Sequence, residues 1–413
     1  MSRPLLLVAQ GDRAGLAAAL QRAWDDHLTV AIAAPEEAAL LAQALPVVSE
    51  PGWGAAVVLG TGGTSGARRW CLQSLLQLQA AADATGLWLR ELGLEPSRLE
   101  LFNPLPLHHV SGLLPLVRAH RWGAALRWLP PQWMRDPAQL PCPAAPALLS
   151  LVPTQLQRLL EQPLGQRWLG QFALIWVGGA ALPQAVAEQC RHLGLRLSPC
   201  YGSTETGAMV AALSPQLFLA GARGCGQPLP HARLRLDPAT GALQIRAASL
   251  ALGFLDDGRF LPLPLLQGWW SSGDRARFTA DGLQVQGRLD GAITSGGETV
   301  FPEQVEQRLL TLSRVAGLPL ADLLLLAEPD PLWGERLVGL VKPSAASVGD
   351  PEALLQKLEG LARDLPPSQR PRRWLLCPEL ERTSAGKWQR LRWCRWLTAL
   401  ERPPSARTPP ANG

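Results

Sequence analysis

The chain has 413 residues, of which 47% are hydrophobic and 18% are charged. This length predicts two or three domains, and the composition is that of a core-forming globular protein, which excludes a disordered chain. No apolar run is long enough to span a bilayer, and the short apolar run after Met1 lacks a secretory cleavage pattern, so we expect a cytoplasmic protein.

Charge and cysteine spacing exclude further classes. The formal net charge is +5, but basic residues are spread along the chain and only residues 363–395 are dense in them, so we expect no nucleic-acid partner. The seven cysteines include no C-x-x-C pair, which argues against a metal site or a disulfide framework. Lysine occurs only at positions 342, 357 and 387. Each lysine is therefore of interest as a compact charge that arginine does not replace.

The first sixty residues alternate short apolar runs with helix-like stretches. The runs are LLLVA, TVAIAA and AAVVLG, and between them lie RAGLAAALQRAW and PEEAALLAQAL. This alternation predicts α/β architecture.

A glycine-rich segment, GTGGTSGARR, covers residues 60–69. We expect a strand before it and a helix, RWCLQSLLQLQAAADATG, after it. In that context the backbone N–H groups can surround phosphate oxygens, and the hydroxyls of Thr61, Thr64 and Ser65 add donors. The segment is neither a Walker A loop nor a dinucleotide fingerprint. The alternative is a flexible Gly/Ser turn.

Two further segments stand out. Residues 105–123, LPLHHVSGLLPLVRAHRWG, carry His108, His109, Ser111 and Arg118 in an otherwise apolar stretch, and such a polar cluster is unlike pure core. Residues 148–160, LLSLVPTQLQRLL, predict an amphipathic helix after a strand.

Residues 172–206 predict a nucleotide side. FALIWVGGAALPQAVAEQC indicates a buried strand, a turn and a helix, and its small turn residues, Gly178 to Ala180, let a planar ring approach the backbone. YGSTET follows, in which Tyr201 can stack on adenine. Thr204 offers a hydroxyl to phosphate, and Glu205 offers a carboxylate to Mg²⁺.

From residue 221 the pattern becomes strand-rich, with a hairpin expected at Pro238 to Gly241. Asp274 in GWWSSGDRARF offers a bidentate acceptor to ribose hydroxyls. Residues 287–306, GRLDGAITSGGETVFPEQVE, then run from Arg288 through a double glycine to a helix near Glu303. Taken alone, this segment is equally well interpreted as a glycine-rich turn between strands.

Beyond this segment, helices and strands are mixed and predict a small α+β unit. Its last motif is ERTSAGKWQRLRW, which contains Lys387. The tail PPSARTPPANG predicts disorder.

In their order and spacing these motifs resemble those of the adenylate-forming enzymes, the acyl-CoA synthetase and adenylation-domain superfamily, over about residues 55–395. The family's phosphate loop is usually written T-S-G-T-T-G-x-P-K, and here Arg68 and Arg69 stand in place of the proline and lysine. The region before the loop is shorter than the family usually has. The phrase S-L-V-P-T-Q-L-x-R-L-L most resembles the branch that activates 2-succinylbenzoate in menaquinone and phylloquinone biosynthesis.

The resemblance implies a fold and a domain organisation. The fold is the α/β adenylate-forming fold, with a large domain at residues 1–289 that includes a β-rich subdomain. A small mobile α+β domain covers residues 290–400, a disordered tail covers residues 401–413, and Asp290 is the hinge.

The resemblance also implies site residues. Catalysis would depend on Lys387, Glu205, Thr204 and Arg69, with Glu205 also holding Mg²⁺. The acyl substrate would be bound by His109, Ser111 and Arg118. ATP and CoA would be bound by a larger set: Thr61, Gly62, Gly63, Thr64, Ser65, Gly66, Gly178, Gly179, Ala180, Tyr201, Gly202, Asp274, Arg288, Gly296 and Gly297.

The implied reaction has two halves. An acid oxygen attacks the α-phosphorus of ATP and pyrophosphate leaves, and then the CoA thiolate attacks the acyl-adenylate carbonyl and AMP leaves. Between the halves the small domain rotates about Asp290, withdraws Lys387 and presents the loop at residues 295–297. The expected partners are a small carboxylic acid, ATP and CoA, without membrane insertion, and a homodimer is left open.

Three alternatives stay open on the sequence. The chain resembles a 2-succinylbenzoate ligase, but another aryl- or acyl-CoA ligase or a carrier-loading adenylation enzyme differs only in the acyl pocket. A non-catalytic relic or basic binding protein is the third, although Glu205, Asp274, Arg288 and Lys387 all occur together. Arg118 either binds the ring carboxylate of 2-succinylbenzoate with its planar fork or has a structural role at a helix end or surface acid.

Overall fold

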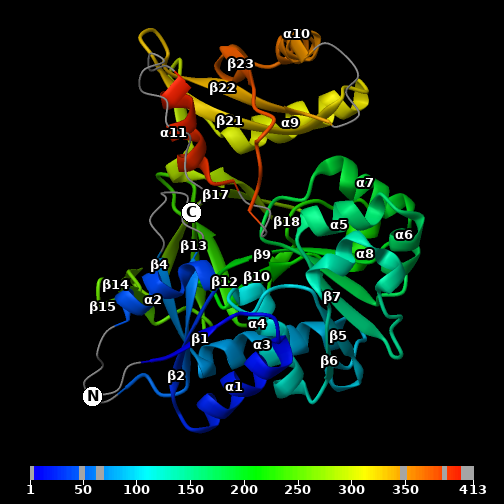
Figure 1. Ribbon diagram of the computed structural model, residues 1–413, viewed down its shortest axis with the longest axis vertical. Coiled ribbons are helices and arrows are strands. Elements are labelled where there is room, and N and C mark those ends of the chain that lie inside the picture. The colour runs from blue at the N-terminus through cyan, green and yellow to red at the C-terminus, as the bar shows by residue number, and fades with distance from the viewer. Residues whose placement is uncertain (1–3, 46–51, 62–68, 345–350, 384–387, 401–413) are drawn as a thin grey trace.

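The computed structural model describes residues 4–45, 52–61, 69–344, 351–383 and 388–400. Within these residues helices and strands alternate over most of the chain, and the strands form four sheets (Figure 1). The α/β fold class expected from the sequence is confirmed. No helix in this part of the chain is both long and apolar enough to cross a membrane.

The first sheet contains β1 (Leu5–Val8), β2 (Thr29–Ala33), β3 (Ala56–Thr61), β4 (Arg69–Ser74), β14 (Gly253–Asp256) and β15 (Arg259–Pro262), in that order. The first three strands are parallel and the rest antiparallel. Every residue of β3 is buried, as expected for a β-branched apolar run inside a sheet. The helices α1 (Arg13–Asp25) and α2 (Ala38–Ala44) connect these strands.

The expected helix directly after the glycine-rich segment is wrong. Residues 69–74 form β4, an antiparallel partner of β3, and α3 (Leu75–Glu91) begins only after it. Trp70 and Leu72 pack in one apolar core while Cys71 packs in another, so this stretch is buried on both faces as a central strand is. The side chain of Ser74 accepts a hydrogen bond from the Gln77 N–H in a capping box, which starts the helix.

The second sheet runs in the order β11 (Gln227–Pro228), β10 (Ala208–Ala212), β9 (Leu197–Ser203), β8 (Leu174–Val177), β7 (Ala147–Leu151), β5 (Glu100–Asn103) and β6 (Ala125–Trp128). Its strands are parallel from β6 to β9. One face packs against α5 (Pro153–Leu160), α6 (Pro163–Leu169), α7 (Gln184–His192) and α8 (Pro215–Leu219).

The helices α3 and α4 (Val110–Trp122) lie between the first two sheets (Figure 1). Leu78 and Leu113 pack with Val57 of the first sheet, whereas Leu89 and Ala119 pack with strands of the second. Side chains on both faces of α4 are therefore buried, one face against the first sheet and the other against the second.

The third sheet is antiparallel. It contains β12 (Ala232–Leu236), β13 (Ala242–Ala247), β17 (Trp269–Thr279), β16 (Leu265–Leu266) and β18 (Gly282–Arg288). The expected hairpin joins β12 to β13, and the Asp237 carboxylate accepts from the N–H groups of Ala239 and Thr240 in its turn.

Short 3-10 helices occur between the longer elements. Five of them begin at proline: Pro35–Glu37, Pro96–Arg98, Pro131–Arg135, Pro137–Gln139 and Pro367–Gln369.

The fourth sheet belongs to a C-terminal unit at one end of the molecule (Figure 1). The unit contains β19 (Ile293–Ser295), β20 (Glu298–Val300), α9 (Pro302–Val315), β21 (Leu320–Asp330), β22 (Gly334–Pro343), α10 (Pro351–Ala362), β23 (Arg373–Leu376) and α11 (Arg390–Leu400). Its two apolar cores draw only on residues between Ile293 and Leu397. The domain division at Asp290 and its mobility stay predictions, and residues 401–413 lie outside the described residues.

Candidate active site

Tyr201 and Asp274 meet where the second and third sheets adjoin. Tyr201 lies on β9, and its hydroxyl donates to Asp274 Oδ2 on β17 at 2.5 Å. Burial, followed by the adjacent carboxylate, raises the pKa of Tyr201, and burial also raises the pKa of Asp274 although the Tyr201 hydroxyl counteracts it. The neutral Tyr201 hydroxyl thus donates to the partly buried Asp274 carboxylate. This hydrogen bond holds together two residues that are predicted to bind the nucleotide.

Arg288 joins this pair from the end of β18. It lies opposite Asp274 in the antiparallel register, and its Nη1 is 3.7 Å from Asp274 Oδ1 and donates to the Ser272 carbonyl at 2.8 Å. Its Nε and Nη2 donate to the two oxygens of Asp290 at 3.0 and 2.8 Å. Arg288, one of the residues expected to bind ATP or CoA, and Asp290, the predicted hinge residue, therefore form one bidentate ion pair.

Thr204 and Glu205 lie in the tight turn between β9 and β10. The Thr204 carbonyl accepts from the Gln73 side chain at 2.7 Å, and the Glu205 carbonyl accepts from Ala251 N–H at 2.8 Å. Glu205 is buried, and its charge raises the pKa values of Cys71 and Asp274 in addition to the larger effect of burial. The turn is thus held by β4 and by the loop before β14.

The predicted phosphate loop lies partly outside the described residues. Gly62, Gly63, Thr64, Ser65 and Gly66 lie outside the described residues, as does Lys387. The two flanking residues, Thr61 and Arg69, are register partners at the end of the β3–β4 pair. Thr61 is buried with its Oγ1 unbonded within the described part. The Arg69 guanidinium lies 4.6 Å from the Phe254 ring centre. Because a strand follows the loop, the expected helix N-terminus does not contribute there.

The small residues predicted at the adenine, Gly178 to Ala180, form the turn that follows β8. A side chain at Gly178 would lie 2.9 Å from the sulfur of Cys200 on the neighbouring strand. At Gly202 an added Cβ would lie 1.8 Å from the Ala208 carbonyl oxygen. Packing within the sheet therefore explains both glycines without a ligand.

The double glycine at positions 296 and 297 forms the two-residue turn between β19 and β20, with φ values of +60° and +81°. Both residues at positive φ are typical of a type I′ hairpin, which glycine readily forms. A Cβ at Gly296 would also lie 2.5 Å from the Trp333 ring. The turn itself accounts for this motif, and a role in CoA binding stays a prediction.

On the expected substrate side, His109 is the N-cap residue of α4, and its ring centre lies 4.4 Å from that of His108. Ser111 is exposed in the first turn. Arg118 follows seven residues later on the same side of the helix, and there it is buried with only 4% of its surface exposed. One face of α4 therefore runs from solvent at Ser111 into the interior at Arg118.

Arg118 lies in an unusual environment for a guanidinium. Its Nη2 is 3.4 Å from Thr85 Oγ1, and its Cζ lies 4.6 Å from the Trp176 ring centre. Its Nε is buried without a hydrogen-bond partner, and no carboxylate contacts it in the described part of the chain. Burial lowers the pKa of Arg118 to about 10. The second suggested role, pairing with a surface acid, therefore does not fit the burial of this side chain.

Sequence reasoning missed two groups near Arg118. Trp176 on β8 is buried, and its Nε1 has no hydrogen-bond partner within the described residues. Nδ1 of His231 is also buried without a partner there, while Nε2 of the same ring is 2.9 Å from Ser249 Oγ. Burial, and then the charge of Arg118, lower the pKa of His231 to about 4. The tryptophan inside LIWV could have suggested a buried donor, whereas nothing in the local sequence marks His231.

The described residues contain no group of three or more His, Cys, Asp or Glu side chains arranged to hold a metal. A single carboxylate such as that of Glu205 can still serve a Mg²⁺ ion in a nucleotide site. Such an ion takes one or two protein carboxylates and completes its shell with phosphate and water.

A family model described as AMP-binding enzyme matches residues 7–255. The 2-succinylbenzoate–CoA ligase of Salmonella typhimurium is 32% identical over 297 residues, which cover 71% of this chain and 59% of that protein. The indoleacetate–CoA ligase of Aromatoleum aromaticum is 28% identical over 303 residues, covering 70% of this chain and 57% of that protein. The chain thus spans less than two thirds of the length of these curated relatives.

A solved structure has the same fold. It is the o-succinylbenzoate CoA synthetase of Bacillus subtilis in complex with the acyl-adenylate intermediate OSB-AMP, with a TM-score of 0.77 and 18% identity over 94% of this chain and 88% of that one. At this identity the likeness concerns the fold alone, which is the adenylate-forming fold expected from the sequence.

Proposed function

The chain belongs to the AMP-binding enzyme family, and we propose that it is an AMP-forming acid–thiol ligase. It converts 2-succinylbenzoate, ATP and CoA to 2-succinylbenzoyl-CoA, AMP and pyrophosphate through an acyl-adenylate, a step of menaquinone or phylloquinone biosynthesis. The Salmonella typhimurium relative bears the name of this activity.

The environment of Arg118 is the observation that carries the choice of acid. 2-Succinylbenzoate has a second carboxylate on its ring, and a buried carboxylate needs a cation and hydrogen bonds. Arg118 is a buried guanidinium with an unbonded Nε and no carboxylate contact among the described residues. A ring carboxylate at this point would supply the missing partner.

The nucleotide half of the proposal depends on the cluster around Asp274. Asp274 would bind the ribose hydroxyls with Arg288, while the Tyr201 ring would stack on adenine. The hydrogen bond from Tyr201 to Asp274 supports this arrangement, because it sets the ring and the carboxylate relative to each other. Thr204 would donate to phosphate, and Glu205 would hold Mg²⁺, which supplies positive charge to the triphosphate.

In the first half-reaction the acid oxygen bonds to the α-phosphorus and the bond to pyrophosphate breaks. Negative charge accumulates there, so preorganised donors and cations accelerate this step. Arg69, the loop at residues 61–66 and Lys387 would supply them. In the second half-reaction the CoA thiolate bonds to the carbonyl carbon and AMP leaves. Rotation about Asp290 between the halves would withdraw Lys387 and present Gly296 and Gly297 to CoA.

A second candidate is an aryl-CoA ligase for an acid with a single carboxylate. The 28% identity to an indoleacetate–CoA ligase favours it. The two candidates differ at the acyl pocket, since an acid with one carboxylate leaves nothing to neutralise Arg118.

ATP-dependent thioester formation tests the proposal, with 2-succinylbenzoate compared with benzoate, indoleacetate and a fatty acid. We expect the highest kcat/KM for 2-succinylbenzoate. Preference for benzoate or indoleacetate would replace the first candidate with the second. Failure to release pyrophosphate with any of the acids would contradict ligase activity.

A further inference from the structure

The turn that carries Thr204 and Glu205 contains strained backbone. Ala208, at the start of β10, has a φ of +75°, and Gly207 before it has a φ of +61°. A residue with a side chain is strained in this left-handed region, and it stays there only where its surroundings hold it. Backbone strain of this kind is concentrated at functional sites. The turn therefore depends on contacts that hold it in place.

Thr206 holds the turn from within. Its side chain is buried, and its Oγ1 accepts from the Ser203 N–H at 2.8 Å and donates to the Ala208 carbonyl at 2.6 Å. The Gly207 N–H also donates to the Thr204 carbonyl at 3.2 Å. None of these bonds uses the Thr206 carbonyl, which can therefore accept from a partner outside the turn.

Ser249 is that partner. It is completely buried in the segment between β13 and β14, and its Oγ donates to the Thr206 carbonyl at 2.7 Å. The same segment reaches the turn a second time, because the Ala251 N–H donates to the Glu205 carbonyl at 2.8 Å. A Cβ at Gly207 would lie 3.2 Å from the Ser249 carbonyl oxygen. The segment thus packs directly on the turn.

His231, the residue before β12, holds this segment in turn. Its carbonyl accepts from the Ala248 N–H at 3.2 Å, and its Nε2 is 2.9 Å from Ser249 Oγ. A serine hydroxyl has one proton, and Ser249 gives it to the Thr206 carbonyl, which can only accept. Nε2 of His231 therefore carries a hydrogen and donates it to Ser249 Oγ. The hydrogen-bond partners assign the tautomer of the ring.

The surroundings of His231 keep it in this state. Burial, and then the charge of Arg118, lower the pKa of His231 to about 4. Around pH 7 the imidazole is therefore neutral and keeps one N–H donor. One chain of hydrogen bonds then runs from His231 through Ser249 to the Thr206 carbonyl.

We propose that His231 is a positioning residue that fixes the Thr204–Glu205 turn through Ser249. It sets where the Thr204 hydroxyl and the Glu205 carboxylate stand. This inference rests on the proposed function, in which Thr204 donates to phosphate and Glu205 holds Mg²⁺. Residues that orient a metal ligand in this way matter nearly as much as the ligand, because a displacement of about 1 Å can slow a reaction by about 100-fold.

The test measures Mg²⁺ dependence in the full-length protein, with the most reactive acid of the substrate panel. His231→Leu removes the N–H donor. The free Mg²⁺ concentration that gives half-maximal ATP–pyrophosphate exchange should rise by about 10- to 100-fold. Calorimetry without any acid should show a comparable loss of affinity for MgATP. Thioester formation from pre-made acyl-adenylate should be spared, because pyrophosphate and its Mg²⁺ take no part in that step.

Two further variants at histidines separate the hydrogen bond from general packing. His231→Gln keeps an N–H that can reach Ser249, so it should recover most of the loss, and a defect equal to that of His231→Leu would contradict the inference. His192→Leu is the matched control, because His192 is exposed at the end of α7. It should behave as the wild type does, and an equal loss of MgATP affinity there would show that the effect is not specific to His231.

Ser249→Ala removes the middle of the chain, and it replaces His231→Leu in the test if that variant does not fold. It should raise the Mg²⁺ requirement in the same way. In the Ser249→Ala background His231→Leu should add less than about a twofold loss, because residues that act as a unit are not additive. Multiplicative losses would overturn the inference.

The remaining outcomes separate this inference from the proposed function. If His231→Leu raises the KM for the acid and leaves the Mg²⁺ requirement unchanged, His231 belongs to the acyl site beside Arg118 and the inference is wrong. Glu205→Gln tests the proposed role of the carboxylate, and an unchanged Mg²⁺ requirement there would overturn that role and the inference with it. A strong shift in Glu205→Gln beside none in His231→Leu refutes only the inference.

Discussion

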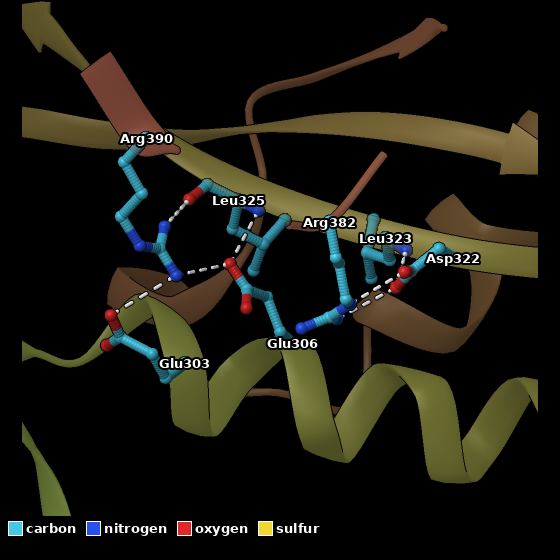
Figure 2. Close-up of polar contacts among 7 residues, drawn as sticks. All are labelled: Glu303, Glu306, Asp322, Leu323, Leu325, Arg382 and Arg390. Carbon is cyan, nitrogen blue, oxygen red and sulfur yellow. Dashed lines mark hydrogen bonds and ion pairs between the residues drawn. The ribbon is translucent and has the colours of Figure 1, made fainter. Parts of the chain in front are cut away.

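Two arginines in different parts of the molecule, Arg118 buried and Arg390 with 14% of its side chain exposed, have opposite surroundings. Arg118, between the first two sheets, contacts the Thr85 hydroxyl and the Trp176 ring and no carboxylate in the described part of the chain. Arg390, in the C-terminal unit, contacts two carboxylates and a carbonyl. No carboxylate in the described part of the chain compensates the first charge, whereas two carboxylates compensate the second (Figure 2). The uncompensated charge of Arg118 is where we propose that a ligand carboxylate binds.

The pKa values follow the same division. Burial lowers the pKa of Arg118 to about 10. Burial acts in the same direction on Arg390, but the carboxylates of Glu306 and Glu303 outweigh it, so the pKa of Arg390 is raised. Carboxylates therefore surround Arg390 in the C-terminal unit, whereas the surroundings of Arg118 between the first two sheets stay positively charged.

The largest expected effect comes from Asp290, the proposed hinge between these two regions. Asp290→Pro should let adenylation proceed and abolish CoA transfer, because proline fixes φ and removes the swivel. The half-reactions are measured separately, by pyrophosphate exchange and by thioester formation. Asp290→Asn, which leaves the backbone free, is the control. Normal rates of both half-reactions in the proline variant would show that the two regions do not move about this residue.

Lys387→Ala should have the next largest effect. Loss of one preorganised charge at the developing negative charge slows a reaction by about 100- to 1000-fold, so pyrophosphate exchange should fall by that amount. Thioester formation from pre-made acyl-adenylate should be spared. Equal loss of both steps would mean that the C-terminal unit works as a scaffold and not through this lysine.

Arg118→Leu should sharpen the comparison through two measurements on one variant. Truncating one partner of a buried charge pair costs about 2–5 kcal/mol, so the KM for 2-succinylbenzoate should rise by more than tenfold while that for ATP changes little. The ratio of kcat/KM for 2-succinylbenzoate to that for an analogue without the ring carboxylate should fall. The ligand-free protein should be no less stable, since removing an unmatched buried charge is neutral or stabilising.

Arg390→Leu is the counterpart of Arg118→Leu. It should lower the free energy of unfolding by about 3–5 kcal/mol, because Glu306 would be left buried without its partner. Chemical denaturation of both leucine variants without substrate measures the contrast. If Arg118→Leu destabilises the protein as much as Arg390→Leu, or if its KM rises equally with both acids, Arg118 has a structural role instead of a ligand.

Local pattern predicted most of the fold. The buried strand before Gly178, the hairpin at Pro238 to Gly241 and the helix near Glu303 depend on neighbouring residues, and each is present. β4 was missed because its short apolar stretch runs directly into the helical pattern of α3. Its strand state is set by β3 and β14 on either side, and β14 lies about 180 residues later in the chain.

The sequence predicted residue types at the site but not their contacts. Asp274 and Arg288 were identified from motifs, yet the hydrogen bond from Tyr201 to Asp274 joins strands 73 residues apart. Arg118 was chosen for its chemistry, whereas its lack of a carboxylate depends on Trp176 and Thr85 from other elements. The Arg390 network was missed for the same reason, since Glu306 is 84 residues away.

The smallest expected effect is a pH dependence of stability from Glu306. Burial raises the pKa of Glu306 from 4.5 to about 7, although Arg390 counteracts it. The charged groups facing Glu306 are Glu303 on α9 and Arg390 on α11, and Cys394 on α11 acts on Arg390. Because the folded pKa is the higher one, the stability that this group contributes is complete below about pH 4.5 and is lost as pH rises through about 7.

Glu306→Gln removes this titration. From pH 5 to pH 8 the wild-type protein should lose on the order of 2 kcal/mol relative to the variant, because the wild-type carboxyl must ionise in a buried site. Chemical denaturation at constant ionic strength across this range measures the difference. The two stability curves should converge or cross toward high pH. Parallel curves would mean that Arg390 keeps the Glu306 carboxylate ionised at every pH tested.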